Sequence, residues 1–218
     1  MRKLEDAYLH KGLRKQLVEL LKEKGITDSG VLEAIGNIPR HFFLDSAFDR
    51  IAYEDRAFPI AANQTISQPY TVAYQTQLLE VKQGEKVLEI GTGSMYQTTV
   101  LAAMGASVYT IERQKELFVQ TAKYLFKEQY PDIVFHFGDG FEGMPEFAPF
   151  DKILITAAAP QIPEKLWAQL KVGGKMVIPV DESDGVQRMM RLTKKKDGTE
   201  KRESFDEFSF VPMLKGKS

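Results

Sequence analysis

Residues 86–96 constrain the fold of this chain most, because they combine a buried strand, a glycine turn and the start of a helix. The apolar strand formers in this stretch are Val87, Leu88 and Ile90. Gly91 and Gly93 have no Cβ atom, so a ligand can approach the backbone closely. A helix that begins near Ser94 directs its free N–H groups toward the same place. The stretch therefore predicts a ligand-binding turn at the end of a strand.

A second apolar run, residues 108–111, ends in Glu112, roughly twenty residues after the first glycine. In nucleotide-binding α/β folds, an acid at this place binds the ribose hydroxyls, although a solvated acid at a strand end is the alternative. The dinucleotide fingerprint requires glycine where this chain has Tyr96, and the Gly-Lys-Ser/Thr phosphate loop is absent. The pattern favours an adenosine ligand without a pyrophosphate.

Strand and helix patterns alternate regularly from residue 86 onward. The expected strands cover residues 86–90, 107–112, 133–137, 153–155 and 175–179. Helices between apolar strands predict a parallel sheet covered on both faces. Two further strands, 187–193 and 205–211, flank Asp197-Gly198, a strong hairpin signal, so we expect an antiparallel ending with residues 194–196 at its solvated tip.

Helical patterns dominate the N-terminal part of the chain. We expect one helix to end near Gly25, a second to be capped by Asp28 or Ser29, and a third to begin at Pro69. A later helix should carry Leu117, Ala122 and Leu125. We expect a single domain over residues 1–218, in which residues 1–60 are helical decoration and 61–218 form the α/β core.

Composition excludes several classes of protein. The 218 residues include 29 basic and 30 acidic side chains, so no overall charge favours nucleic acid or an anionic membrane. The chain has no cysteine and only three histidines, far apart in sequence, so we expect no metal site. No apolar run approaches the ~20 residues of a membrane span. We expect a soluble, cytoplasmic protein.

Five segments carry a resemblance to a known family. Residues 88–94 (Leu-Glu-Ile-Gly-Thr-Gly-Ser) resemble the first motif of S-adenosylmethionine-dependent methyltransferases. Residues 40–42 (Arg-His-Phe), 52–55 (Ala-Tyr-Glu-Asp), 64–69 (Gln-Thr-Ile-Ser-Gln-Pro) and 210–213 (Phe-Val-Pro-Met) resemble, in order, the protein-L-isoaspartate O-methyltransferases. The last two segments are the most specific.

This resemblance implies a fold and a reaction. The fold would be a doubly wound, mostly parallel seven-stranded sheet of the Rossmann-like class I methyltransferase type, with a C-terminal antiparallel hairpin and extra N-terminal helices. The reaction would transfer a methyl group from S-adenosylmethionine to the α-carboxylate of L-isoaspartyl residues in damaged proteins and peptides, and the ester would close to a succinimide that reopens partly as aspartate. A carboxylate with a pKa near about 4 is ionised at neutral pH, so the nucleophile needs no general base. We expect a monomer.

The resemblance also implies site residues. Those expected to bind the cofactor are Glu89, Gly91, Thr92, Gly93, Ser94, Glu112, Arg113, Asp139 and Gly140. Those expected to bind the substrate are Ala61, Ala62, Ile66, Val211, Pro212 and Met213. Glu112 would hold the ribose, Glu89 would interact with the methionine portion, and Asp139 would meet the adenine amino group where Gly140 permits close approach. The alternatives are structural: a buried strand acid for Glu89, a turn aspartate for Asp139 and edge-strand packing for Val211 and Met213.

Ser67 is the expected catalytic residue, whose hydroxyl would orient the reacting carboxylate. Because Ser67 lies just before Pro69, it is also a candidate N-cap of the following helix. Substitution by alanine separates the two interpretations, since loss of a cap reduces stability whereas loss of a site residue reduces turnover.

The chain departs from the family pattern at Met95, Ala61 and Asn63, where glycine is usual. Met95 would either crowd the methionine portion of the cofactor or point into the core, and the other two could reshape the peptide entrance. These departures keep two alternatives open: a methyltransferase for another carboxylate or a small molecule, and a cofactor- or peptide-binding protein with reduced or no catalysis.

Overall fold

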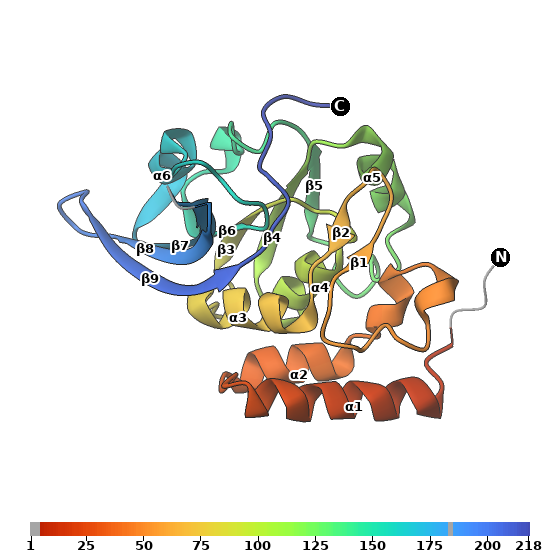
Figure 1. Ribbon diagram of the computed structural model, residues 1–218. Helices are drawn as coiled ribbons and strands as arrows, with labels where there is room; N and C mark the ends of the chain where they lie inside the picture. Colours follow the sequence, from red (N-terminus) through yellow and green to blue (C-terminus); the bar gives the residue numbers. More distant parts are fainter. Residues whose placement is uncertain (1–4, 183–184) are drawn as a thin grey trace.

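The centre of the fold is a seven-stranded sheet, seen in a computed structural model that describes residues 5–182 and 185–218 (Figure 1). Its strands are β3 (Lys86–Ile90), β4 (Ser107–Glu112), β5 (Val134–Phe137), β6 (Phe150–Ile155), β7 (Leu170–Asp181), β8 (Gln187–Lys194) and β9 (Glu200–Phe208). They lie in the order β5-β4-β3-β6-β7-β8-β9. The first five are parallel, and β8 and β9 are antiparallel to their neighbours. The predicted fold class is confirmed.

The strand order places the glycine turn where a ligand can reach it. From β3 the chain adds β4 and β5 on one side and then returns to place β6 on the other side of β3. The connections therefore diverge at the carboxyl ends of β3 and β6, which leaves a crevice there. Gly91 follows β3 directly and lies at this crevice.

Helices cover both faces of the sheet (Figure 1). They are α1 (Tyr8–Glu23), α2 (Ser29–Asn37), α3 (Pro69–Leu79), α4 (Tyr96–Ala103), α5 (Lys115–Gln120) and α6 (Glu164–Gln169). Short 3-10 turns are η1 (Arg40–Phe43), η2 (Ser46–Phe48), η3 (Thr121–Lys123) and η4 (Pro145–Phe147). α3 and α4 pack on one face of the sheet and α6 on the other, each through buried aliphatic side chains. No helix in the described part of the chain is both long and apolar enough to cross a membrane.

α1 and α2 form an additional layer outside α3 and α4 (Figure 1). Asp28 caps α2 as predicted, since its side chain accepts hydrogen bonds from the N–H groups of Gly30 and Val31. The buried core of this layer includes Leu17 and Leu21 of α1 and continues into Tyr96 and Val100 of α4. The N-terminal helices and α4 thus share one apolar core.

The helix predicted to reach Leu125 was too long. α5 ends at Gln120 and is followed by the 3-10 turn η3. Tyr124 then adopts non-helical backbone angles, which buries its ring and lets its hydroxyl hydrogen-bond with that of Thr99 at 2.8 Å. Leu125 is left 49% exposed. Burial of an aromatic ring outweighs helix propensity here.

The C-terminal hairpin forms, but two details differ from the prediction. Lys194 is not part of a solvated tip, because its ammonium group donates hydrogen bonds to the carbonyl oxygens of Trp167 and Leu170 at the end of α6. The last strand, β9, spans Glu200–Phe208 instead of the predicted 205–211, so it begins earlier and ends earlier. The following segment pairs instead with Ala158, whose N–H donates to Val211 at 2.9 Å and whose carbonyl accepts from Met213 at 2.7 Å. This pairing brings residues 209–214 to the crevice.

Candidate active site

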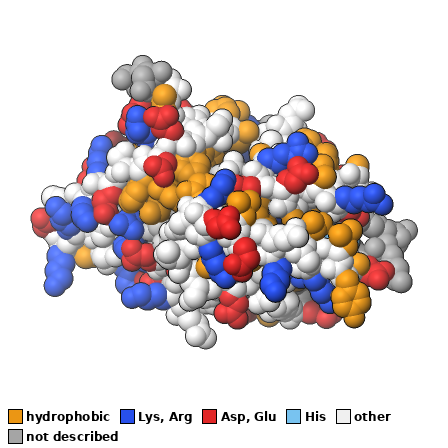
Figure 2. Space-filling view, turned by 60° about the horizontal axis from the view of Figure 1, so that its bottom comes forward, with side chains coloured by type: hydrophobic (Ala, Val, Ile, Leu, Met, Phe, Trp, Pro, Cys, Tyr) orange, Lys and Arg blue, Asp and Glu red, His pale blue; other side chains and the backbone are white. Residues whose placement is uncertain are grey.

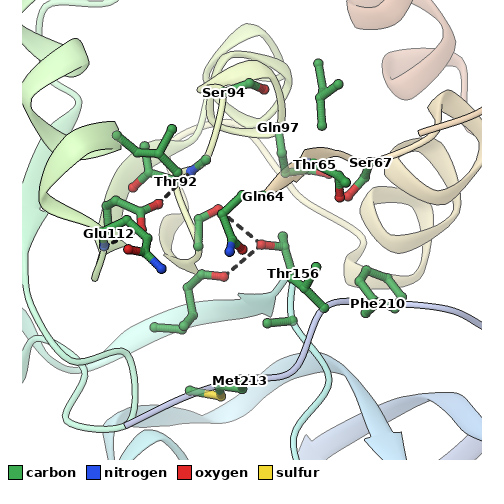
Figure 3. Close-up of a pocket in the computed structure, with 18 of the residues that line it drawn as sticks. Gln64, Thr65, Ser67, Thr92, Ser94, Gln97, Glu112, Thr156, Phe210 and Met213 are labelled. Atoms are coloured by element: carbon green, nitrogen blue, oxygen red, sulfur yellow. Dashed lines mark hydrogen bonds between the residues drawn. The ribbon is translucent and has the colours of Figure 1, made fainter. Parts of the chain in front are cut away.

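A pocket lies at the carboxyl ends of β3, β4 and β6, where the strand order predicts one (Figure 3). Its walls come from residues 64–68, 90–94, 96–97, 111–114, 156–157 and 209–214. Figure 3 shows Thr92 and Glu112 on one side of the pocket and Thr65, Ser67 and Phe210 on the other. The pocket therefore brings the predicted cofactor and substrate residues together from distant parts of the chain.

The glycine turn has the conformation that its sequence predicts. Gly91 has a φ of 99°, and a Cβ atom there would lie 2.4 Å from the Thr156 hydroxyl oxygen. That hydroxyl donates to the carbonyl oxygen of Ile90 at 2.9 Å (Figure 3). Both the backbone angle and Thr156 therefore require glycine at position 91.

Glu112 is held in the pocket wall by two backbone donors. One carboxylate oxygen accepts from the N–H of Gly93 at 2.9 Å, and the other from the N–H of Gln114 at 2.7 Å. The residue is 4% exposed, so it is not a solvated acid at a strand end. A carboxylate fixed in this way keeps lone pairs available to accept from a pair of ligand hydroxyls.

Glu89 has a different environment. It is completely buried, does not line the pocket, and accepts a hydrogen bond from the Thr98 hydroxyl at 2.5 Å. Its other carboxylate oxygen has no hydrogen-bond partner among the described residues. Burial raises the pKa of Glu89 to about 7. This geometry corresponds to the structural alternative, a strand acid beneath α4.

Asp139 also lies outside the pocket lining. One of its carboxylate oxygens accepts from the N–H of Phe141 at 2.9 Å, and the other from the N–H of Gly216 at 2.6 Å. Gly140 does line the pocket, but a Cβ there would lie 2.5 Å from a methyl carbon of Ile90. Glycine at position 140 is thus required by packing against β3.

Residues 215–218 form a C-terminal strap that the sequence did not indicate. The carbonyl of Gly216 accepts from the Arg113 side chain at 3.1 Å. The N–H of Ser218 donates to the Arg113 carbonyl at 2.9 Å, and the N–H of Lys115 donates to the Ser218 carbonyl at 2.6 Å. The strap therefore borders residues 113–115, which directly follow Glu112.

Ser67 lines the opposite end of the pocket (Figure 3). The N-cap residue of α3 is Gln68, and the N–H of Tyr70 is satisfied by the carboxylate of Asp55 at 2.7 Å. The N-cap interpretation of Ser67 is therefore wrong. The Ser67 carbonyl accepts from Arg40 at 2.8 Å, whereas its hydroxyl makes no hydrogen bond in the described part of the chain.

The remaining substrate candidates divide into two groups. Those that line the pocket are Ile66, Val211, Pro212 and Met213. Ala61 and Ala62 do not; they belong to the turn between β1 (Phe58–Pro59) and β2 (Thr65–Ile66), and Ala61 lines a second, adjacent pocket. Ala62 and Asn63 in this turn have φ values of 56° and 54°, so the left-handed backbone explains a preference for glycine near this position.

Met95 has a φ of 70° and is the N-cap residue of α4. Its side chain lines the second pocket, together with Phe43, Leu44 and Tyr124, and does not line the first. Crowding of the cofactor by Met95 stays a prediction, whereas the alternative of a core position is wrong, because the residue is only half-buried. The backbone at this place prefers glycine, and the side chain is directed toward the second pocket.

Sequence reasoning missed several residues of the pocket wall, among them Gln64, Thr65, Gln97, Thr156 and Phe210. Thr156 could have been found, because it follows β6 directly and so lies at the carboxyl edge of the sheet. The side-chain amide nitrogen of Gln97 donates a hydrogen bond to the Thr76 hydroxyl at 3.0 Å, whereas its amide oxygen has no partner among the described residues.

A second cluster of polar groups, Asp6, His10 and His41, lies in the N-terminal layer. The two imidazole rings are stacked with centroids 3.8 Å apart, so one metal ion cannot lie in the plane of both rings. Both nitrogens of His41 already have partners, the Tyr53 hydroxyl and the Glu5 carbonyl. The arrangement suits packing, not metal binding.

The lining of the first pocket suits a cationic adenosine ligand. Arg113 is the only basic side chain among the lining residues that the structure describes, and it is bonded to the C-terminal strap. A phosphate ligand would normally meet more positive charge or a phosphate loop. Glu112 adds a negative charge beside the glycine turn. These features fit S-adenosylmethionine, which carries a sulfonium and no phosphate.

Comparison with known proteins gives consistent results. The family model described as protein-L-isoaspartate(D-aspartate) O-methyltransferase matches residues 12–218. Protein-L-isoaspartate O-methyltransferases from Christiangramia forsetii and Flavobacterium johnsoniae are 56% and 55% identical, each covering 99% of this chain and 100% of the relative.

Solved structures agree with the sequence relatives. A Plasmodium falciparum protein described as a protein-L-isoaspartate O-methyltransferase, in complex with S-adenosyl-L-homocysteine, has a TM-score of 0.80 and 27% identity, and the match covers 95% of this chain and 99% of that one. Another protein-L-isoaspartate O-methyltransferase structure has a TM-score of 0.82 at 28% identity, and the match covers 91% of this chain and 65% of that longer chain.

Proposed function

The chain belongs to the protein-L-isoaspartate(D-aspartate) O-methyltransferase family, which transfers a methyl group from S-adenosylmethionine to L-isoaspartyl residues of damaged proteins, and we propose that the pocket at β3, β4 and β6 is where it does so. The observation that supports this assignment is that Glu112 and Ser67 lie at opposite ends of one pocket. A cofactor held by the first would present its reactive end toward the second.

We assign the Glu112 end to the cofactor. Glu112 accepts hydrogen bonds from the ribose hydroxyls, and Gly91 and Gly93 let the cofactor lie against the backbone. Further cofactor contacts in this assignment come from Thr92, Ser94, Arg113 and Gly140. When bound, S-adenosylmethionine supplies a methyl group activated by its sulfonium.

We assign the Ser67 end to the substrate. Its nucleophile is a carboxylate, already ionised at neutral pH, so the protein needs to orient it and exclude water. The Ser67 hydroxyl, which makes no hydrogen bond in the described part of the chain, donates to this carboxylate. Ile66, Val211 and Met213 add apolar surface to the pocket lining.

Glu89 and Asp139 act indirectly in this proposal. Glu89 supports the first turns of α4 through Thr98, and Asp139 holds the C-terminal strap through Gly216. Both acids therefore shape the pocket from outside its lining.

We further infer a single-domain, monomeric, cytoplasmic protein that does not bind nucleic acid. The shared core of α1 and α4 supports a single domain. Acidic and basic side chains are interspersed on the face in Figure 2, and the formal net charge is −1, which disfavours a polyanionic partner.

Methyl transfer to an isoaspartyl peptide, measured beside its aspartyl twin with labelled cofactor, tests the function. We expect base-labile label on the isoaspartyl peptide alone. Ser67→Ala should reduce kcat by about 10- to 100-fold, because a misplaced nucleophile reacts slowly. It should leave the free energy of unfolding within about 0.5 kcal/mol of wild type, because no cap is lost.

Ser107→Ala is the matched control. Ser107 lies at the amino end of β4, away from the pocket at the carboxyl ends, so this variant should be fully active. Label on both peptides, or on neither despite cofactor binding, would reject the proposed reaction. Normal turnover by Ser67→Ala would reject only the role of this serine.

A further inference from the structure

Arg40 is a completely buried cation without an acidic hydrogen-bond partner in the described part of the chain. It is the first residue of η1, next to the N-terminal helices. Its Nε donates to the carbonyl of Ala52 at 3.0 Å, and its Nη2 donates to the carbonyl of Ser67 at 2.8 Å. Buried charges in proteins are usually paired with an opposite charge, so this arginine is unusual.

The surroundings of Arg40 do not favour stability. Its guanidinium lies 4.8 Å from the centre of the Tyr96 ring. Its Nη1 and the Tyr96 hydroxyl are both buried and have no hydrogen-bond partner among the described residues. Burial lowers the pKa of Arg40 to about 10, and the nearby Tyr96 and Asp55 oppose this shift only in part. A buried cation without a direct ion pair adds little stability. Stability is therefore a weak explanation for an arginine at this position.

The contacts of Arg40 join the two ends of the pocket. Ser67 lies at the proposed substrate end, and Tyr96 is the first residue of α4, directly after the cofactor turn. Arg40 itself does not line the pocket. We propose that Arg40 is a positioning residue, which holds the Ser67 peptide against the start of α4 so that the Ser67 hydroxyl meets the substrate carboxylate in line with the cofactor. This inference rests on the role proposed above for Ser67.

Arg14 provides a matched control in the same layer. It is 6% exposed, and its guanidinium pairs with the carboxylate of Asp6 at 2.9 Å and donates to the Tyr53 hydroxyl at 3.1 Å. It contacts neither Ser67 nor the pocket lining. Replacement of Arg14 should therefore affect the fold alone.

Steady-state kinetics of Arg40→Lys and Arg14→Lys test the inference. Lysine keeps the charge but has no planar fork, so it cannot hold two carbonyl groups and the Tyr96 ring together. We expect Arg40→Lys to lower kcat for the isoaspartyl peptide at least about tenfold, with the affinity for S-adenosyl-L-homocysteine within about twofold of wild type. Arg14→Lys should lower the melting temperature and leave kcat within about twofold of wild type.

A double mutant distinguishes positioning from general damage. If Arg40 acts by positioning the Ser67 hydroxyl, it has no role in a variant that lacks this hydroxyl. Adding Arg40→Lys to Ser67→Ala should therefore lower kcat by no more than about twofold relative to Ser67→Ala alone. Multiplication of the two single effects would overturn the inference, as would a normal kcat in Arg40→Lys. Arg40→Gln, which keeps a donor amide, replaces the lysine variant if that one does not fold.

Failure of this inference can be told apart from failure of the proposed function. An inactive wild-type protein would reject the proposed function itself, and an unaffected Ser67→Ala would reject the role of the serine. Failure of both Arg40 variants to fold would show that Arg40 serves the fold alone, which overturns this inference only.

Discussion

Left-handed backbone at non-glycine residues is the clearest local irregularity of this protein. It occurs at Ala62, Asn63, Glu80 and Met95 within the described residues. Three of them flank the pocket, two in the β1–β2 turn and one at the start of α4. An L-residue in this conformation is strained by roughly 1–2 kcal/mol, and glycine is not.

Met95→Gly should therefore raise the free energy of unfolding by about 0.5–1 kcal/mol, after allowance for the larger entropy of glycine in the unfolded chain. Because the Met95 side chain lines the second pocket, the affinity for S-adenosyl-L-homocysteine should stay within about twofold of wild type. Urea denaturation and calorimetry measure the two quantities.

Ala62→Gly is the control for the backbone effect, since it relieves a similar φ of 56° without removing a long side chain. It should give a similar gain in stability. A tenfold gain in cofactor affinity for Met95→Gly alone would show that the methionine does obstruct the cofactor.

At the scale of elements, the start of α3 is capped from a distance. Asp55 accepts from the N–H of Tyr70, and its other oxygen pairs with the ammonium group of Lys24 at 2.5 Å. The Lys24 ammonium also lies 4.9 Å from the centre of the Tyr70 ring. One carboxylate thus ties α1 to the helix that follows Ser67.

Asp55→Ala should lower the free energy of unfolding by about 1–2 kcal/mol, because a helix cap and a buried partner of a charge are both lost. Amide hydrogen exchange should increase first at the N-terminus of α3. Ser67→Ala should change neither quantity, and equal losses in the two variants would contradict the assignment of the cap.

The elements show what can be predicted from sequence here and what cannot. The strand–helix alternation, the cap at Asp28 and the hairpin at Asp197-Gly198 depend on neighbouring residues, and the structure confirms them. The end of α5 was missed because it depends on the burial of Tyr124 against α4, a contact between distant segments.

The same distinction holds within the pocket. Gly91, Glu112 and Ser67 lie in the lining because strand ends and motif positions place them there. Glu89 and Asp139 do not line the pocket. The carboxylate of Glu89 accepts a hydrogen bond from Thr98 on the next helix, and that of Asp139 accepts one from Gly216 near the C-terminus. Side-chain partners that are distant in sequence leave no periodic signal.

For the whole molecule, Glu89 links stability to pH. Burial raises its pKa from 4.5 to about 7, so in this range the native state retains a proton that the unfolded chain releases. The contribution of this group to stability is therefore complete below about pH 4.5 and is lost as the pH rises through 7.

Glu89→Gln should remove this dependence. Relative to wild type, the variant should gain stability as the pH rises from 4.5 to 7, by up to about 3 kcal/mol. Denaturation curves across that interval provide the measurement. Glu116→Gln, which removes an exposed carboxylate on α5, should follow the wild-type curve, and identical curves for wild type and Glu89→Gln would contradict the prediction.

The strap formed by residues 215–218 has a practical consequence for preparing the protein. Its hydrogen bonds to Arg113, Lys115 and Asp139 place Ser218 beside the loop that follows Glu112 (Figure 1). An affinity tag fused after Ser218 would begin at these hydrogen bonds, next to the proposed ribose site. The described part of the chain begins at Glu5, ahead of α1 in the outer helical layer, so purification handles for cofactor-binding work belong at the N-terminus.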